Sequence, residues 1–178
     1  SSGIGKTRLA LAVARQRVAL HGHGVWWVDL GALRTADQIA PAIAQDAGIP
    51  LGDGDAATLL RRALALRDTL LVLDNCEHLI AEVCRIAAAA LAGAPKLRLL
   101  ATSLESLKMA GEQVLRLDPL AVPPTPMPLE LARCFGAIQL LEQRAQAVDQ
   151  HFCLSQATVN PAIDLCRQLD GVALAIEM

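Results

Sequence analysis

Short apolar runs alternate with amphipathic stretches along the first two thirds of the chain. The runs at residues 25–30 (VWWVDL), 69–73 (TLLVL) and 97–101 (LRLLA) are typical of strands, and continuous runs of this kind suit a parallel sheet buried on both faces. The alternating segment 112–117 (EQVLRL) predicts a further strand. Helices are expected over residues 6–20, 36–47, 56–67 and 76–92. Strands that alternate with helices predict an α/β domain with a parallel sheet and right-handed crossovers.

Several predicted helices carry residues that suit their positions. Thr35 and Asp55 precede the second and third helices, where their side chains can accept backbone N–H groups and cap the helix. In the first helix, Leu9, Val13 and Leu20 are expected to share one apolar face.

The residue pattern of the chain changes after residue 117. Prolines are dense between residues 119 and 128, which indicates a linker-like segment. Helical spacing follows at Cys134, Ile138, Leu141, Ala145 and Val148. Asn160 and Pro161 read as a cap and a first-turn proline, opening a helix that runs to about Asp170. We therefore expect an α/β core over residues 1–122 and a helical part over residues 129–178.

Composition narrows the function classes. The chain has 178 residues, of which 53% are apolar, and can bury a sizeable core. Its formal net charge of −2 predicts no long-range attraction to nucleic acid or anionic lipid. Aromatic residues make up 2% of the chain, which argues against a base-stacking surface. No apolar run reaches the roughly 18 residues of a membrane span.

Cysteine and histidine usage predicts no metal or disulfide framework. The five cysteines are odd in number and never form a CxxC pair, which fits a reducing cytoplasm. His21 and His23 form an HxH pair, but no further Cys or His lies near them in the sequence. We therefore expect a cytoplasmic location and no metal role for this pair.

The first residues match the second part of a phosphate-binding loop, G-x-x-x-x-G-K-[ST]. Gly5, Lys6 and Thr7 supply its last three positions, and the first glycine is expected to precede Ser1. Glycines let backbone N–H groups converge on phosphate oxygens, and the N-terminus of the following helix favours the same anion. Lys6 would neutralise phosphate charge and Thr7 would offer its hydroxyl to Mg²⁺. The alternative is a glycine-rich helix cap with an exposed lysine.

A phosphate loop also needs a carboxylate at the end of a buried strand to hold the Mg²⁺ shell. Asp74 follows Leu70–Leu73 and meets this description, although a solvated turn residue is the alternative. The next residue is Asn75, whose amide cannot take a proton; it could position water or cap the helix from Cys76. Glu77 would suit the first turn of that helix. These residues predict tight nucleotide binding and slow hydrolysis.

With these residues in view, the chain resembles the STAND class of P-loop ATPases, the NB-ARC and AP-ATPase relatives. More narrowly, it is similar to the ATPase segment of large bacterial transcriptional regulators that carry a winged-helix or LuxR-type DNA-binding domain. The resemblance rests on GIGKTRLALAVA, GVWWVDL, LLVLDNCEHL, LRLLATS, GEQVLRLDPL and LCRQLDGVALAIE, in this order along the chain.

Two positions depart from the family pattern. Where the family has TSRE, this chain has Leu104 after Thr102 and Ser103, and leucine cannot contact phosphate. Where the family has GLPLA, Ala173 replaces the proline near adenine. The resemblance implies nucleotide contacts from Gly3, Ile4, Gly5, Lys6, Thr7, Arg8, Thr102 and Ser103, an Mg²⁺ site at Thr7 and Asp74, and catalytic roles for Asp74 and, weakly, Asn75.

The resemblance implies a P-loop NTPase sheet followed by the start of a small helical domain that closes over the nucleotide. The expected function is an ATP/ADP-binding switch in a multidomain regulator, with Mg²⁺ as cofactor and slow hydrolysis. Other domains of the same polypeptide and self-association on ATP are the expected partners, and DNA is reached only through a domain outside this segment. A turnover ATPase and a nucleotide-free scaffold remain alternatives. The strand before the loop is expected inside the sheet, so the isolated 178 residues should bind nucleotide poorly.

Overall fold

The computed structural model describes residues 2–50 and 55–178. Within them the chain forms two compact units, each with buried hydrophobic clusters. We call Lys6–Val114 the α/β unit, and Leu115–Met178 with the residues up to Gly5 the helical unit. Ser1, the first variable position of the predicted phosphate loop, lies outside the described residues.

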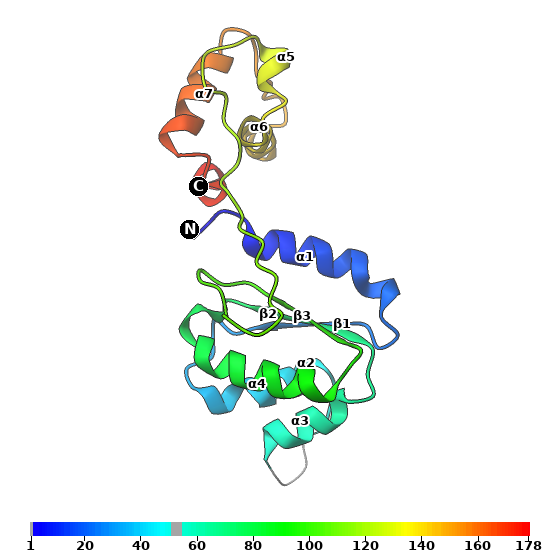
Figure 1. Cartoon of the computed structure of the whole chain (residues 1–178). Coiled ribbons are helices and arrows are strands. Elements are labelled where there is room, and N and C mark those ends of the chain that lie inside the picture. The colour runs from blue at the N-terminus through cyan, green and yellow to red at the C-terminus, as the bar shows by residue number, and fades with distance from the viewer. Residues whose placement is uncertain (1, 51–54) are drawn as a thin grey trace. The chain divides into compact units, whose positions relative to one another are not determined.

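The α/β unit alternates helices and strands, as predicted (Figure 1). In chain order it contains α1 (Lys6–Arg17), the 3₁₀ turn η1 (Val18–Leu20), β1 (Val25–Asp29), η2 (Ala36–Gln38), α2 (Ile39–Asp46), α3 (Ala56–Leu64), β2 (Thr69–Asp74), η3 (Cys76–His78), α4 (Ile80–Gly93) and β3 (Leu97–Ala101).

A three-stranded parallel sheet is the centre of this unit, and β2 is its middle strand. Trp27 of β1 pairs with Val72 of β2, which in turn pairs with Leu100 of β3. All six residues of β2 are buried, as its continuous apolar run predicts, because α1 covers one face of the sheet while α2 and α4 lie on the other (Figure 1). The α/β class and the parallel sheet flanked by helices are thus confirmed.

The face of α1 that packs on the sheet differs from the expected one. Ala10 and Ala14 are buried against β2 residues such as Val72. Leu9 and Leu20, expected on a shared apolar face, are 40% and 64% exposed. Alanines let the helix backbone approach the sheet closely, which larger side chains on that face would prevent. The periodicity of large residues therefore selected the wrong face.

The opposite face of the sheet holds the main core. Alternate residues of β1 and β2 point into it and meet helices α2, α3 and α4. Its fully buried side chains include Val28, Leu73, Ile39, Ile43, Leu60, Leu64 and Val83. These strands are consequently held in register by burial on both faces, which fixes where their carboxyl ends lie.

Asp55 caps α3 as predicted, whereas at Thr35 the observed contact comes from the backbone. The Asp55 carboxylate accepts a hydrogen bond from the backbone N–H of Thr58 at 2.9 Å, at the start of α3. Hydrogen bonds from Thr58 also lower the pKa of Asp55. Thr35 precedes η2, and its backbone N–H donates to the side-chain carbonyl of Gln38 at 3.2 Å.

Residues 112–117 do not form a strand, so this prediction was wrong. Val114 and Leu115 are 56% and 79% exposed, and no strand of the described ranges pairs with the segment. The Glu112 carboxylate instead accepts hydrogen bonds from the backbone N–H groups of Leu107 and Met109 at 2.8 and 3.2 Å. An alternating pattern cannot form a strand without a neighbour that satisfies its backbone groups.

The helical unit packs four helices around a separate core. They are α5 (Leu129–Ala132), α6 (Gly136–Val148), α7 (Val159–Gln168) and α8 (Ala173–Glu177). Helix α7 begins at Val159, so Asn160 lies inside the helix and is not its cap, whereas Pro161 occupies the first turn as expected. Ile138 and Ile163 are fully buried in this core.

Glu142 links three parts of the helical unit. Its carboxylate accepts hydrogen bonds from Arg133 Nε and Nη2 at 3.2 and 2.7 Å, and from the backbone N–H of Leu154 at 3.2 Å. The bond from Arg133 is the main reason that the pKa of Glu142 lies below its usual range near 4.5. The Glu142 side chain is 14% exposed and the Arg133 side chain is 36% exposed, so solvent screens part of the attraction in this bidentate pair.

Replacing Glu142 with Gln is expected to lower the unfolding free energy of the helical unit by about 1–2 kcal/mol at neutral pH. The folded pKa lies below the unfolded one, so the stabilisation is present above about pH 4.5 and is lost as pH falls through the folded value. Thermal unfolding between pH 3 and 7 measures this. The exposed Glu130 of α5 offers a matched control, Glu130→Gln. An acid dependence unchanged by Glu142→Gln would contradict this role.

Candidate functional site

The carboxyl ends of the strands gather polar side chains in the α/β unit. Asp29 ends β1, Asp74 ends β2, and Thr102 follows β3 directly. Asp29 and Asp74 are register partners, and the backbone N–H of Thr102 donates to the carbonyl of Leu73 at 2.9 Å. Ligands of open α/β sheets bind at this edge, so it is the first place to look for a site.

Thr7, Asp74 and Thr102 meet at this edge. The Thr7 hydroxyl lies 2.9 Å from Asp74 Oδ1 and 3.1 Å from Oδ2, although the two residues are 67 positions apart. The Thr102 hydroxyl donates to Asp74 Oδ1 at 2.5 Å. Asp74 is 3% exposed and Thr102 is 7% exposed, whereas Thr7 is exposed. A ligand arriving from solvent would therefore meet the Thr7 hydroxyl first, with the carboxylate beneath it.

Thr102 also fixes the turn that follows β2. Its hydroxyl accepts a hydrogen bond from the backbone N–H of Asn75 at 3.1 Å, and its backbone carbonyl accepts one from the backbone N–H of Cys76 at 3.0 Å. One residue at the end of β3 thus holds both Asp74 and the two residues after it. This preorganisation is a requirement for a binding site whose groups must not move when the ligand arrives.

The oxygen atoms of Thr7 and Asp74 suit a hard cation such as Mg²⁺, most of whose ligands would come from phosphate and water. Among residues 2–50 and 55–178, no group of three or more His, Cys, Asp or Glu side chains could hold a metal ion. Mg²⁺ is usually held by one or two carboxylates together with substrate phosphates and water. Thr7 and Asp74 fit such a shared site, in which they would hold the metal together with phosphate and water.

Gly3, Ile4 and Gly5 of the predicted phosphate loop directly precede α1. Gly3 and Gly5 have φ angles of +75° and +100°, which glycine adopts without steric cost. A Cβ on Gly3 would also lie 2.9 Å from Leu174 Cβ within the helical unit, and the Gly3 carbonyl accepts from the Leu174 N–H at 2.9 Å. Ile4 is buried. Gly3 is therefore required both by its backbone conformation and by the side chain beside it.

Lys6, Thr7 and Arg8 form the first turn of α1, as predicted. Ser103 is half-buried, and its hydroxyl accepts from the backbone N–H of Glu105 at 3.3 Å, which is a local turn contact. Leu104 is 48% exposed. Of the predicted site residues, hydrogen bonds therefore bring Thr7, Asp74 and Thr102 together and leave Ser103 in its own turn.

Asn75 does not cap the helix that follows it. Its side chain makes no capping hydrogen bond to η3, and its amide Nδ2 instead donates to Asp29 Oδ1 at 3.0 Å. Sequence reasoning missed Asp29. The available signal was its place at the last position of an apolar strand, because parallel strands present their final residues at one edge.

Cys76, directly after Asn75, has a structural role. Its thiol is fully buried and donates to the carbonyl of Leu73 at 3.4 Å. Burial, with smaller contributions from the Glu77 and Asp74 carboxylates, raises the pKa of Cys76 to about 12. The side chain therefore remains a neutral thiol and supplies neither a nucleophile nor a metal ligand. Glu77 lies in η3 and has one buried carboxylate oxygen, Oε2, without a hydrogen-bond partner.

His21 and His23 tie together the loops that lead into β1 and β2. His21 Nδ1 lies 2.9 Å from Asp68 Oδ1, and the backbone N–H of Asp68 donates to His23 Nδ1 at 3.0 Å. The hydrogen bond with His21 lowers the pKa of Asp68. These contacts lie at the amino ends of the strands, away from Asp74, and explain the HxH pair without a metal.

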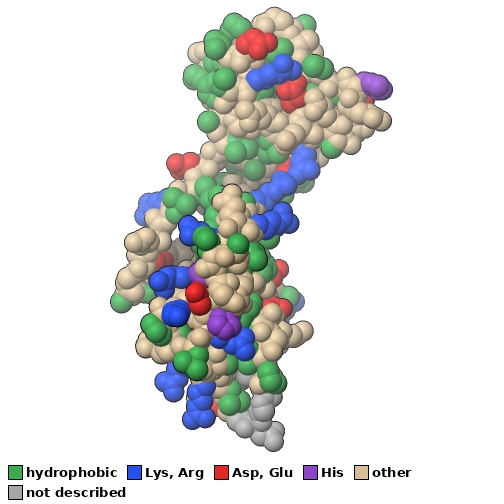
Figure 2. Space-filling view, turned by 90° about the vertical axis from the view of Figure 1, so that its right-hand side faces the viewer, with side chains coloured by type: hydrophobic (Ala, Val, Ile, Leu, Met, Phe, Trp, Pro, Cys, Tyr) green, Lys and Arg blue, Asp and Glu red, His purple; other side chains and the backbone are tan. Residues whose placement is uncertain are grey.

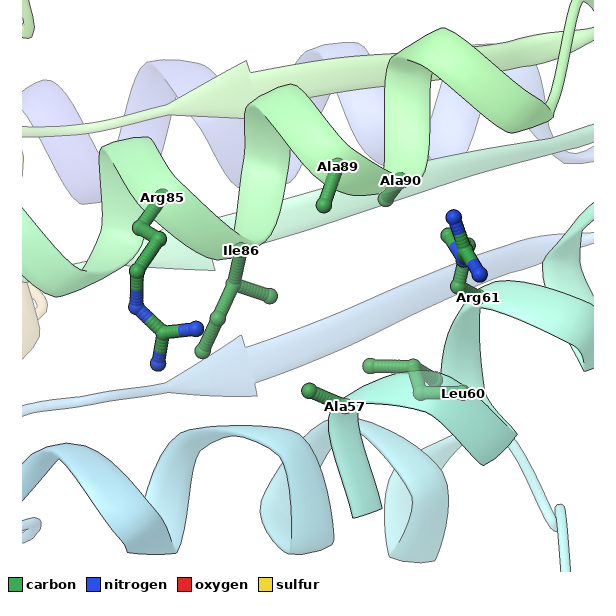
Figure 3. Close-up of a pocket in the computed structure, with 7 residues that line it drawn as sticks. All are labelled: Ala57, Leu60, Arg61, Arg85, Ile86, Ala89 and Ala90. Carbon is green, nitrogen blue, oxygen red and sulfur yellow. The ribbon is translucent and has the colours of Figure 1, made fainter. Parts of the chain in front are cut away.

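The cavity between α3 and α4 is too small for a nucleotide. Its volume is about 20 Å³, room for roughly one water molecule. Figure 3 shows the side chains of the two helices facing each other across it, with Arg85 at one end and Arg61 at the other. The lining residues are Ala57, Leu60, Arg61, Arg85, Ile86, Ala89 and Ala90. It is a packing defect between helices and not a candidate binding site.

The surface gives little further guidance. On the face that Figure 2 shows, basic, acidic and hydrophobic side chains lie next to one another. No helix within residues 2–50 and 55–178 is long and apolar enough to span a membrane.

Comparison with known proteins finds relatives that include proteins described as transcriptional regulators. No protein-family model matches it. It is 33% identical over 177 residues to an uncharacterized protein of Mycobacterium tuberculosis, covering 99% of this chain and 42% of that protein. It is also 33% identical over 178 residues to a protein of the same species named "Putative HTH-type transcriptional regulator", covering 99% of this chain and 19% of that protein. A protein of Mycobacterium bovis with the same description matches equally. The chain thus spans less than half the length of these relatives.

Proposed function

We propose that this chain is the nucleotide-binding segment of a multidomain bacterial transcriptional regulator, in which ATP and ADP act as the switch. The observation that carries the proposal is the hydrogen bond between Thr7 at the N-terminus of α1 and the buried Asp74 at the end of β2. A helix N-terminus favours anions, and a strand-end carboxylate beside a hydroxyl favours Mg²⁺. The two together suit a magnesium nucleotide better than either an anion or a metal alone.

The residues of the site have distinct roles in this proposal. Lys6 neutralises phosphate charge, and the N–H groups of the loop at Gly3–Gly5 bind phosphate oxygens. Thr7 and Asp74 would together hold Mg²⁺, which would neutralise phosphate charge when bound. Thr102 keeps Asp74 in place throughout.

Slow hydrolysis follows from the residue after Asp74. Asn75 has no atom that accepts a proton near neutral pH, so the site has no strong general base there. A nucleotide that is bound tightly and hydrolysed slowly keeps each state long enough to act as a switch. The relatives described as HTH-type regulators support this use, with DNA bound by a domain outside this segment.

A turnover ATPase is the second candidate, and the rate of hydrolysis separates the two. Steady-state turnover above about 1 s⁻¹, a typical lower value for enzymes, would favour the enzyme. A third candidate, an empty scaffold, predicts no nucleotide binding at all.

The test is equilibrium binding of fluorescent ATP and ADP to the full-length protein in the presence of Mg²⁺. Thr7→Val removes the hydroxyl at nearly constant volume and is expected to weaken binding of both nucleotides about 10-fold. Thr7→Ser keeps the hydroxyl and serves as the matched control, with affinity close to that of the unmodified protein. Failure of the unmodified protein to bind either nucleotide would end the proposal.

A further inference from the structure

Asp29 makes a contact that the proposed roles of Thr7, Asp74 and Thr102 do not use. Its Oδ1 accepts two hydrogen bonds, from the Asn75 amide Nδ2 at 3.0 Å and from the backbone N–H of Gly31 at 2.8 Å. Asp29 and Asn75 lie 46 positions apart, at the ends of neighbouring strands. Asp29 is exposed and Asn75 is half-buried, so the pair faces the same solvent-accessible edge as Thr7.

The surroundings leave little freedom to this pair. A Cβ on Gly31 would lie 3.1 Å from Asp29 Oδ1 and 3.2 Å from Asn75 Nδ2, closer than ordinary contacts allow. The backbone N–H of Leu30 donates to the carbonyl of Asp74 at 2.9 Å, which fixes the chain directly after Asp29. Glycine at position 31 thus leaves space for the pair, and a larger residue there would require the two side chains to shift by a few tenths of an ångström.

The backbone of Asn75 is held in an uncommon conformation. Its φ and ψ are 61° and 51°, in the left-handed region that asparagine tolerates better than most residues. Its N–H is held by the Thr102 hydroxyl. Such conformations cost free energy, and they persist where the surroundings over-determine them, often at functional sites. The effect here is to turn the Asn75 side chain toward Asp29 and away from η3.

The chemistry of the pair fixes which way the amide points. An ionised carboxylate can only accept hydrogen bonds, so Asn75 must present its NH₂ group to Asp29. The amide carbonyl Oδ1 is then directed away from Asp29. A carbonyl oxygen held in one orientation can accept a hydrogen bond from a water molecule, which a freely rotating amide would do only part of the time.

We propose that Asp29 is a positioning residue for hydrolysis: it orients the Asn75 amide so that Asn75 Oδ1 holds the attacking water. This inference rests on the proposed nucleotide-binding function. The oxygen of the water bonds to the γ-phosphorus, and the bond from that phosphorus to the bridging oxygen breaks, with its electron pair leaving on ADP. The proton of the water passes to a γ-phosphate oxygen, because the Asn75 amide is not basic.

The test compares single-turnover hydrolysis and nucleotide affinity in the full-length protein. Asp29→Ala is expected to slow hydrolysis of bound ATP about 10-fold while the affinity for ATP stays within about twofold. Asp29→Asn keeps an acceptor oxygen for the Asn75 amide and is expected to slow hydrolysis less. Asn75→Asp places two carboxylates against each other and is expected to lose activity as well, because like charges at this distance repel. The exchanged pair Asp29→Asn/Asn75→Asp restores one donor and one acceptor, and is expected to recover at least the original rate.

An NMR measurement on the nucleotide-free protein tests the same hydrogen bond independently of the hydrolysis rates. In ¹⁵N-labelled protein, one of the two side-chain amide protons of Asn75 should be shifted and protected from exchange by its bond to Asp29, and both effects should vanish in Asp29→Ala. Asp46, exposed at the end of α2, provides the charge-matched control Asp46→Asn, which is expected to change neither measurement.

The possible outcomes separate this inference from the proposed function. Absence of ATP binding by the unmodified protein overturns both. Tight binding with hydrolysis that Asp29→Ala leaves unchanged overturns only the role of Asp29, as does tight binding with no hydrolysis in a single turnover. Failure of the exchanged pair to recover the rate, in a protein that melts at the original temperature, also contradicts positioning through the hydrogen bond.

Discussion

Replacing Asp74 with Asn is expected to lower the affinity for Mg-ATP and Mg-ADP by about 100-fold, a loss of about 2.7 kcal/mol. The carboxylate is buried and accepts hydrogen bonds from Thr7 and Thr102, so under the proposed function it lies where its charge would stabilise Mg²⁺. An amide keeps the size of the side chain but removes its negative charge. It also replaces one acceptor oxygen with an NH₂ donor, which would face the two hydroxyls.

Removal of Mg²⁺ gives this prediction its control. With EDTA present, the unmodified full-length protein should bind nucleotide as weakly as Asp74→Asn does, and the variant should lose little more. Asp46→Asn changes the same charge on the exposed end of α2 and should bind normally. Calorimetric titration with and without EDTA measures all three proteins. Equal affinities of Asp74→Asn and the unmodified protein in Mg²⁺ would contradict the role given to Asp74.

Replacing Gly171 with Ala is expected to destabilise the helical unit by about 3 kcal/mol or more, through strain and steric overlap together. Gly171 follows α7 with a φ of +65°, and its N–H donates to the carbonyl of Cys166 at 3.0 Å. A Cβ there would lie 2.2 Å from the carbonyl oxygen of Leu120, far inside contact distance with rigid backbone. The overlap would also disrupt the hydrogen bond that the Leu120 N–H donates to the Gly171 carbonyl at 2.9 Å.

Gly48 serves as the control that separates backbone strain from steric overlap. Its φ is +61°, but a Cβ there would meet no atom within 4 Å. Gly48→Ala should therefore cost only the backbone strain, about 1 kcal/mol. Hydrogen exchange resolved by segment measures the two variants, because a single melting curve need not describe a protein with two units. Similar losses of protection in the two variants would mean that the contact with Leu120 is not as close as described.

The sequence predicted the strands of the α/β unit well because their burial is strong. The four residues before Asp74, Leu70–Leu73, are all apolar, and every residue of β2 is buried. The 112–117 segment had an equally clear pattern but no partner strand in the described residues, and a local pattern contains no information about partners. The face of α1 was misjudged for a related reason, since buried Ala10 and Ala14 carry a weaker signal than exposed Leu9.

The candidate site was predictable in part. Thr7 and Asp74 were paired from the chemistry of a magnesium nucleotide, and the structure places their side chains in hydrogen-bond contact. Thr102 was expected to contact nucleotide, and in the structure its hydroxyl also holds Asp74 and the turn after it. Asp29 was missed because its importance arises from strand register, which juxtaposes it with Asn75 across 46 positions.

The most direct measurement of the central claim is a crystal structure of the full-length protein with ADP and Mn²⁺, in which anomalous scattering locates the metal. Our account predicts a metal peak in direct coordination distance of Thr7 Oγ1, with Asp74 against its shell and the diphosphate at the N-terminus of α1. A nucleotide bound elsewhere, or a metal peak remote from both side chains, would contradict it.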